Sequence, residues 1–307
     1  MTHAPFGPRD VFAALSVIVL WGLNFVAMKH ALHDFTPFQL GAARYVAAFL
    51  PLALFIKPPR IPLRLACLYG AFQLGQFAFL FSALQVGMTA ALASVLMQTH
   101  VFFTALLAFG LLHEKPSRTL QVGLGLAALA IACFTMNFVA AEHATALAVT
   151  GFGFVLNLMA ASMWAGGNIV VRKLQATGQP YEAVALVVWT SLVPIVGFAL
   201  LSAVFDPVAT RWRWLDAGWG TWASVAYLGW LATVVGYALW TGLLKRHPAN
   251  RVAPFSLGVP VVGLSAGVFI LGESITGWQW AGIALVVAAL VCVMFGERIV
   301  SRLRRVQ

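Results

Sequence analysis

The chain has 307 residues, of which 61% are hydrophobic and only 9% are charged, and its formal net charge is +10. A soluble protein of this length has no room to bury so much apolar surface and still keep a polar exterior. The positive charge would indicate nucleic acid as the partner of a soluble domain, but here the basic residues sit in short loops. The composition therefore predicts an all-α polytopic membrane protein surrounded by a lipid bilayer, with no nucleic-acid partner.

Ten segments reach the roughly 20 apolar residues that a helix needs to cross a bilayer. The first has no small-residue cleavage site after it, so we expect a retained span and not a signal peptide. Short linkers leave no room for a second soluble domain. The predicted spans are 10–32, 38–56, 62–84, 89–112, 118–138, 147–172, 182–205, 218–245, 251–271 and 276–296.

The chain also contains an internal repeat. Shifting the sequence by 159 positions aligns seven identical residues in one register, including Glu114 with Glu273 and Gly70 with Gly229. Each half then holds five spans, and an odd number inserts the second copy upside down in the membrane. Inverted repeats are typical of secondary transporters, which bind substrate between the halves near the midplane. We therefore expect two five-helix repeats, 1–142 and 143–307, around a central cavity.

The distribution of Lys and Arg predicts the orientation of the spans. With the N-terminus inside, ten spans return the C-terminus to the inside, and fifteen of the nineteen basic residues then fall on the cytoplasmic side. Both termini are therefore expected in the cytoplasm.

Amide side chains inside the spans are candidate binding groups, because an amide facing lipid would stay unsatisfied. Asn24 in the first span and Asn168 in the sixth occupy matching positions in the two halves, and Trp164 shares a helical face with Asn168. The alternative for these amides is a hydrogen bond between helices with no ligand.

Two further spans add amides and aromatic rings to this set. Gln73 and Gln76 lie one turn apart in the third span, and Tyr237 and Trp240 share one face of the eighth. Polar groups on aromatic bodies suit a small amphipathic solute. Simple packing is the alternative for the two aromatic residues.

The remaining candidates lie in spans 2, 4 and 9. Gln98 and His100 fall on different faces of the fourth span. His100 is a candidate for proton coupling or solute binding, since its reference pKa is near neutral, and a hydrogen-bonded neutral histidine is the alternative. Pro254 and Pro260 predict a gating bend in the ninth span. Arg44 in the second span either reaches out to the surface or faces the bundle.

The sequence predicts no catalytic, cofactor or metal site. All nine acidic residues lie in loops or at span ends, which disfavours a carrier driven by embedded carboxylates. The chain has neither a P-loop for nucleotide hydrolysis nor a metal-binding H-E-x-x-H sequence. The three cysteines lie inside apolar segments without ligand spacing, so we interpret them as packing residues.

Several stretches together resemble the EamA-type exporters of the drug/metabolite transporter superfamily, most closely the bacterial O-acetylserine/cysteine exporter branch. They are WGLNFVAMK, QFAFLFSAL, GMTAALASVLMQ, SMWAGGN, ATVVGYALW and RVAPFSLGVPVVGL. The resemblance implies a central cavity lined by spans 1–4 and 6–9, with spans 5 and 10 at the periphery. It also implies export from the bacterial cytoplasm across the inner membrane. Related exporters have a second glutamine where this chain has His100, which leaves the solute and the coupling ion open.

These observations together predict an exporter of small amino acids or related metabolites that works by alternating access. The five amides would bind the polar groups of the solute, and Trp164, Tyr237 and Trp240 would wall the cavity. A transporter of another metabolite or drug class is the first alternative. An intramembrane enzyme is the second, and the absence of clustered carboxylates, cysteines or histidines speaks against it.

Overall fold

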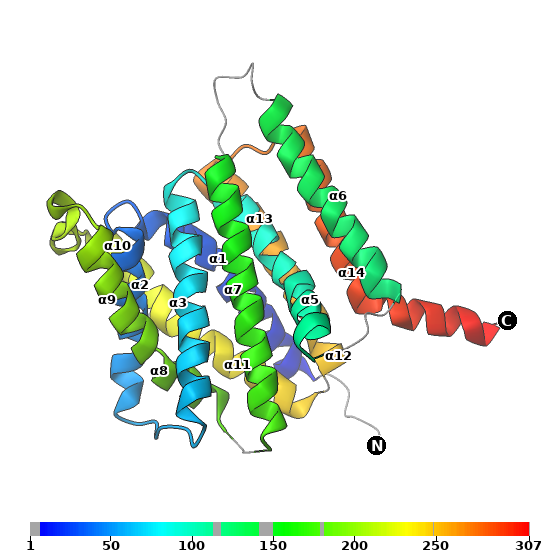
Figure 1. Ribbon diagram of the computed structural model, residues 1–307, viewed down its shortest axis with the longest axis horizontal. Coiled ribbons are helices and arrows are strands. Elements are labelled where there is room, and N and C mark those ends of the chain that lie inside the picture. Colours follow the sequence, from blue (N-terminus) through cyan, green and yellow to red (C-terminus); the bar gives the residue numbers. More distant parts are fainter. Residues whose placement is uncertain (1–6, 113–117, 141–149, 179–180, 248, 307) are drawn as a thin grey trace.

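The protein is described by a computed structural model that covers residues 7–112, 118–140, 150–178, 181–247 and 249–306. All regular secondary structure within these ranges is helical. The helices run side by side as long rods, and α1 begins on the same lower side of the bundle at which α14 ends (Figure 1). A chain that starts and finishes on one side crosses the bundle an even number of times.

The first half of the chain forms five rods, and four of them are single α-helices. Its fourth rod is not one continuous α-helix, because a short 3-10 turn, Met97–Thr99, separates α4 from α5. The elements are α1 (Pro8–Ala31), α2 (Pro37–Ala53), α3 (Leu63–Gln85), α4 (Ala90–Leu96), α5 (His100–Leu112) and α6 (Arg118–Ala140).

The second half repeats this order with more interruptions. A π-helix, Tyr227–Val235, joins α10 to α11, and a 3-10 turn, Ala253–Leu257, joins α12 to α13. The elements are α7 (Gly151–Ala176), α8 (Ala183–Thr190), α9 (Leu192–Phe205), α10 (Trp219–Ala226), α11 (Gly236–Arg246), α12 (Ala249–Val252), α13 (Gly258–Leu271) and α14 (Gly277–Val306).

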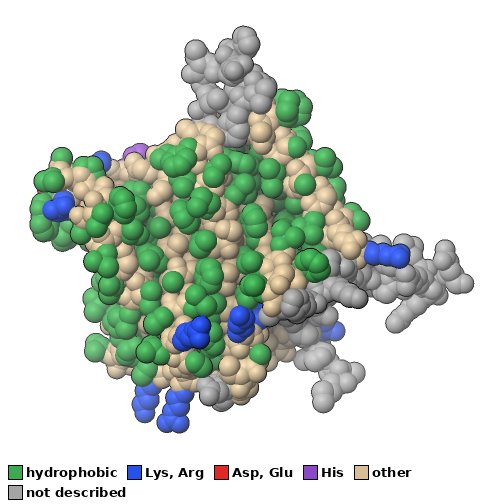
Figure 2. Space-filling model, in the orientation of Figure 1, with side chains coloured by type: hydrophobic (Ala, Val, Ile, Leu, Met, Phe, Trp, Pro, Cys, Tyr) green, Lys and Arg blue, Asp and Glu red, His purple; other side chains and the backbone are tan. Residues whose placement is uncertain are grey.

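Eight helices in the described ranges are long and apolar enough to cross a membrane. The second predicted span is the 17-residue helix α2, and the ninth is apolar over the shorter stretch Phe255–Leu271. Large apolar side chains also lie on the outside of the bundle, among them Phe55 and Phe269, and Figure 2 shows such side chains spread over the whole visible face. The protein is therefore a multi-pass membrane protein, while the count of ten spans stays a prediction.

The two ends of the bundle differ in charge. We call the end that holds the start of α1 and the end of α11 the basic end, and in Figure 2 Lys and Arg side chains gather along it. Its basic residues include Lys57, Arg60, Arg64, Arg172, Lys173, Lys245 and Arg246. We call the opposite end, which holds Asp34, Asp206 and Glu273, the far end.

Helix starts at the far end follow from local sequence. Thr36 begins α2 with a capping box, in which its hydroxyl accepts from the Gln39 N–H and the Gln39 amide oxygen accepts from the Thr36 N–H. Thr89 caps α4 in the same way through the Leu92 N–H. The turn before α4 contains Gly87, whose φ of 108° suits glycine.

The helices α6 and α14 pack closely against each other and lie at one side of the bundle (Figure 1). Their contact is close because it contains glycines: a Cβ at Gly123 would lie 2.5 Å from Val293, and one at Gly282 would lie 2.7 Å from Phe134. The resemblance implies this peripheral position for the fifth and tenth spans. The other helices therefore enclose the interior.

Candidate functional site

An aromatic cluster joins α1 to α11 in the interior. The Trp21 ring centroid lies 5.5 Å from that of Tyr237 and 5.5 Å from that of Trp240. The Trp21 indole N–H also donates to the Ala232 carbonyl oxygen at 2.9 Å. This approach requires Gly236, since a Cβ there would lie 2.5 Å from the Trp21 indole nitrogen. The two predicted wall residues are thus brought together by a tryptophan that sequence reasoning did not select.

Asn24 lies one turn beyond Trp21 on α1. Its side-chain oxygen is buried, and no described group donates a hydrogen bond to it. An amide oxygen buried without a donor costs free energy that a bound ligand with an N–H or O–H group would recover. Asn24 therefore keeps its place as a candidate binding residue.

The two predicted glutamines of α3 differ in their surroundings. Gln73 is buried, and the Thr190 hydroxyl approaches its side-chain oxygen at 3.4 Å, which makes a weak contact with α8. Gln76 lies almost one turn further along α3 and is half-buried. Gln73 is therefore partly engaged in packing, whereas Gln76 is the more accessible of the two.

A second group of predicted residues forms between α5 and α7. The rings of His100 and Trp164 stack with centroids 3.9 Å apart and an interplanar angle of 9°. His100 Nδ1 lies 2.9 Å from the Met97 carbonyl oxygen, one turn earlier. The Asn168 amide donates to the Thr104 hydroxyl at 3.2 Å, and Thr104 donates to the His100 carbonyl at 2.7 Å. Asn168 is therefore bonded between helices, as the packing interpretation requires.

Gln98 and the prolines mark the contact between the fourth and ninth rods. The Gln98 amide donates to the Ser256 carbonyl at 3.3 Å, inside the 3-10 turn that precedes α13. Pro254 is at the start of this turn, and Pro260 lies in the first turn of α13, where an N–H has no intrahelical partner in any case. The helix is thus interrupted before Pro260, at the turn that contains Pro254.

Arg44 faces the bundle and not the surface. Its side chain is buried, with the guanidinium carbon 4.0 Å from the centroid of the Phe77 ring on α3. Its Nη2 donates to the Thr233 hydroxyl on the π-helix at 3.1 Å. Sequence reasoning recorded this arginine as an intramembrane charge but did not place it in the site.

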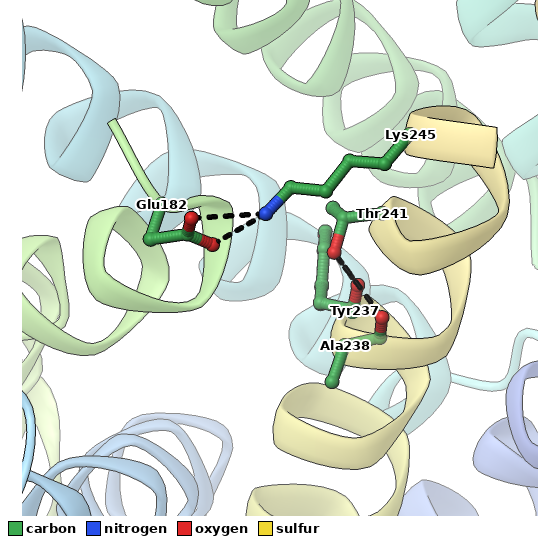
Figure 3. Close-up of polar contacts among 5 residues, drawn as sticks. All are labelled: Glu182, Tyr237, Ala238, Thr241 and Lys245. Carbon is green, nitrogen blue, oxygen red and sulfur yellow. Dashed lines mark hydrogen bonds and ion pairs between the residues drawn. The ribbon is translucent and has the colours of Figure 1, made fainter. Parts of the chain in front are cut away.

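The basic end lies next to the aromatic cluster. Figure 3 shows Tyr237, Thr241 and Lys245 following one another along α11, with Lys245 reaching across to Glu182 at the start of α8. The Lys245 ammonium lies 2.9 and 2.7 Å from the two Glu182 carboxylate oxygens. This ion pair links the end of α11 to the residue that precedes α8.

A cavity in the described structure lies elsewhere. It has a volume of about 980 Å³ and lies between α2, α9 and α10, and none of the predicted binding residues lines it. Its walls are largely apolar, with Trp222 and Trp230 among them, and it borders the lipid-exposed side of α2. We place the candidate site in the interior instead, because unpaired buried polar groups are there.

Comparison with known proteins agrees with this class of membrane protein. The EamA-like transporter family matches residues 9–136 and again residues 151–295, so the chain belongs to this family of membrane transporters. A "Probable amino-acid metabolite efflux pump" of Salmonella typhimurium is 38% identical over 95% of this chain and 96% of its own length. A protein of Escherichia coli with the same description is 38% identical over 94% and 96%.

The fold also occurs among solved structures. One crystal structure superimposes with a TM-score of 0.62 and covers 95% of this chain and 98% of its own, at 18% identity. This similarity supports the helical arrangement described above.

Proposed function

We propose that the protein is a secondary transporter that exports small amino acids or related metabolites, of the O-acetylserine and cysteine type, across the inner membrane of a bacterium. Two relatives that are 38% identical over nearly their whole length carry the description of amino-acid metabolite efflux pumps. The observation that carries the proposal is the aromatic cluster around Trp21, with the unpaired Asn24 oxygen one turn away. A small solute with both polar and apolar parts suits such a site.

In this proposal the solute alternates between the two sides of the membrane. Ten spans form two inverted repeats, 1–142 and 143–307, that move against each other around the site. Asn24, Gln76 and the weakly engaged Gln73 bind the polar groups, while Tyr237 and Trp240 wall the site. Trp164 and Asn168 take part from the second group, and Gln98 takes part from its contact with Ser256. Pro254 lies in the 3-10 turn at which the ninth span bends, and Pro260 follows this turn.

We assign no carboxylate to the coupling of transport to an ion. His100 is the proposed candidate for proton coupling or solute binding, because it stacks on Trp164 within the second group of site residues. If His100 carries a proton, His100→Gln retains solute exchange and loses stimulation of net flux by a pH gradient. Gradient-driven flux that survives in this variant excludes the coupling role.

Counterflow in proteoliposomes tests the proposed function. Purified protein is reconstituted with unlabelled cysteine inside, and uptake of labelled cysteine, serine and a larger apolar amino acid is compared. We expect saturable exchange that Asn24→Leu abolishes while the expression and the elution profile of the protein persist. Ser162→Ala, a change at an exposed hydroxyl, serves as the control and retains exchange. Normal exchange in Asn24→Leu would remove Asn24 from the site.

The orientation is tested by labelling. In a variant lacking Cys67, Cys133 and Cys292, a single cysteine is placed at Pro59 in the α2–α3 connection or at Ala209 after α9. An impermeant maleimide added to intact cells should label the Ala209 position and spare the Pro59 position. The reverse pattern would place the termini outside the cytoplasm.

A further inference from the structure

Arg44 is a charged side chain buried in the middle of α2. Only 4% of its surface is exposed, and the helix places it eight residues from the start of the 17-residue element. A guanidinium stays charged at any physiological pH, and its burial is expensive unless an anion or a full set of acceptors surrounds it. Intramembrane arginines therefore mark functional positions more often than packing positions.

The protein itself satisfies only part of this guanidinium. One nitrogen, Nη2, donates to the Thr233 hydroxyl, and the flat face lies over the Phe77 ring. The other two nitrogens, Nε and Nη1, are buried and make no hydrogen bond to any described group. The adjacent Tyr45 hydroxyl is also buried without a partner among the described residues. Unpaired donors thus cluster at one place in the interior.

No carboxylate of the surrounding helices neutralises the charge. The sequences of α2, α3, the π-helix and α11 contain neither Asp nor Glu. The described carboxylates that form hydrogen bonds lie at the two ends of the bundle, where their partners also lie. These are Asp10 with Arg246, Asp34 with Thr221, Glu182 with Lys245, Asp206 with Thr36, and Glu273 with Ala90 and Ala91.

The π-helix holds Arg44 in place without supplying an anion. Thr233 donates its own hydroxyl hydrogen to the Leu228 carbonyl, five residues earlier, so its oxygen is oriented to accept from Arg44. Gly229 allows this close approach, since a Cβ there would lie 3.0 Å from the Arg44 carbonyl and 2.7 Å from Ala47. π-Helical segments within α-helices are frequent at functional sites. The arginine is therefore positioned, and its remaining N–H groups are left available.

We propose that Arg44 binds the free carboxylate of the transported solute. This inference rests on the proposed function and narrows its substrate class to solutes with an ionised carboxyl group. The α1 helix, which carries Asn24 and the Trp21 ring of the aromatic cluster, packs against the same π-helix as α2. A carboxylate that accepts from a guanidinium forms a charge-assisted hydrogen bond, which is stronger than a hydrogen bond between neutral groups. Esters and amides of the same solutes lack the anion and bind more weakly.

Binding is measured by quenching of tryptophan fluorescence in the purified full-length protein. The probes are cysteine and its methyl ester, and we expect the wild type to bind cysteine roughly tenfold to a hundredfold more tightly. Arg44→Gln should reduce this ratio to about one, mainly by weakening cysteine binding, because glutamine keeps hydrogen-bonding capacity but has no charge. Arg44→Lys should retain part of the ratio. Arg211→Gln, which removes an exposed arginine, is the matched control and should retain all of it.

A ratio that survives in Arg44→Gln overturns the proposal. Equal weakening of cysteine and ester binding, together with a lower unfolding temperature, also overturns it, because that result assigns Arg44 to packing. Thr233→Val provides a milder variant should Arg44→Gln fail to fold. This variant retains the arginine charge but releases Arg44 from the π-helix. It is expected to lower the ratio of cysteine to ester affinity several-fold, and an unchanged ratio then counts against the proposal.

A second probe separates this inference from the proposed function. Acetate, acetamide and chloride are compared at equal concentration for their effect on the unfolding temperature. Stabilisation by acetate alone that is lost in Arg44→Gln supports the carboxylate site. This holds even if cysteine shows no flux, because the absence of cysteine flux would count only against the proposed amino-acid function. Equal stabilisation by chloride indicates a general anion site and overturns the assignment to a carboxylate, as does the absence of any acetate effect.

Discussion

The two ends of the bundle are held together by different kinds of bonds. At the far end, Glu273 accepts from the Ala90 and Ala91 N–H groups at 2.7 and 2.8 Å, at the start of α4. Lys29 donates to the Leu84 and Met88 carbonyls at 2.9 and 3.1 Å, just before that helix. Both charges thus bind backbone groups on either side of the α3–α4 turn, where a carboxylate at a helix start and an ammonium at a helix end are favourable.

At the basic end, the contacts are ion pairs between side chains, and they range from exposed to largely buried. Lys245 and Glu182 are 60% and 71% exposed although their charged atoms lie 2.7 Å apart. Asp10, which is only 15% exposed, lies 2.9 Å from Arg246, which is 54% exposed, and 2.9 Å from the buried His247. Exposed pairs contribute roughly 0–1 kcal/mol each, since water competes for both partners.

This difference shows which end opens at lower cost. Separation of the helices at the far end breaks several half-buried bonds to backbone groups. At the basic end, the Lys245–Glu182 pair is one that water readily replaces, and the contact between Asp10 and His247 is the one buried exception among the ion pairs given above. In an alternating-access cycle, the conformation described here is therefore expected to open more readily at the basic end.

The largest effect is expected from Glu273→Ala. The substitution leaves two N–H groups at the start of α4 without an acceptor and leaves Lys29 without a neighbouring negative charge. We expect a loss of about 2–3 kcal/mol in the free energy of unfolding, the range of hydrogen bonds to charged groups. The readout is the unfolding temperature in detergent, with Glu297→Ala in the C-terminal part of the chain as the control. An unchanged unfolding temperature would contradict the special role of the far end.

A smaller effect is expected from Asp206→Asn, also at the far end. Asp206 is buried and accepts hydrogen bonds from the Thr36 and Ser202 hydroxyls. The amide retains one acceptor oxygen but introduces an N–H₂ group beside two hydroxyls, so we expect a loss of about 1–2 kcal/mol. Thr36→Val combined with Asp206→Asn should be less than additive, because both changes act on one bond.

A pH-dependent effect is expected from Thr221→Val. The hydroxyl of Thr221 donates to Asp34 and holds the pKa of that carboxyl below its ordinary value. A carboxyl group whose pKa is lowered on folding stabilises the folded state at pH values above its ordinary pKa. This stability is lost as the pH falls through the folded-state pKa. Thr221→Val should therefore cost about 0.5–1.5 kcal/mol at neutral pH and less below about pH 4. A difference in unfolding temperature that stays constant down to pH 3 would contradict this.

The smallest effect is expected from Lys245→Ala or Glu182→Ala at the basic end. A double-mutant cycle in detergent should yield a coupling energy below about 1 kcal/mol. High salt should remove most of it, since exposed charges are screened. Coupling above about 2 kcal/mol that persists in high salt would show that the basic end is as firmly closed as the far end, and the comparison would then fail.

The predicted spans agree approximately with the described helices, and local chemistry explains where some of these helices begin. Thr36 and Thr89 begin helices because their hydroxyls reach a nearby N–H group, and glycine allows the turn at position 87. The arrangement of the candidate site residues depends on tertiary packing. The predicted residues separate into a group around Tyr237 and Trp240 and a group around His100 and Trp164, and Asn168 bonds to Thr104. Helical spacing places residues on a face but does not say which helix that face meets.

The sequence by itself determined the membrane class, because a chain with 61% hydrophobic residues has no other stable surroundings. It also determined the family, the approximate helices and the presence of polar groups at bilayer depth. Only the tertiary structure decided that Trp21 meets the π-helix 211 positions away, and that Arg44 points into the bundle and leaves two nitrogens unpaired. The physical reason is that rotation of each helix about its axis depends on packing against distant partners, which local sequence does not specify.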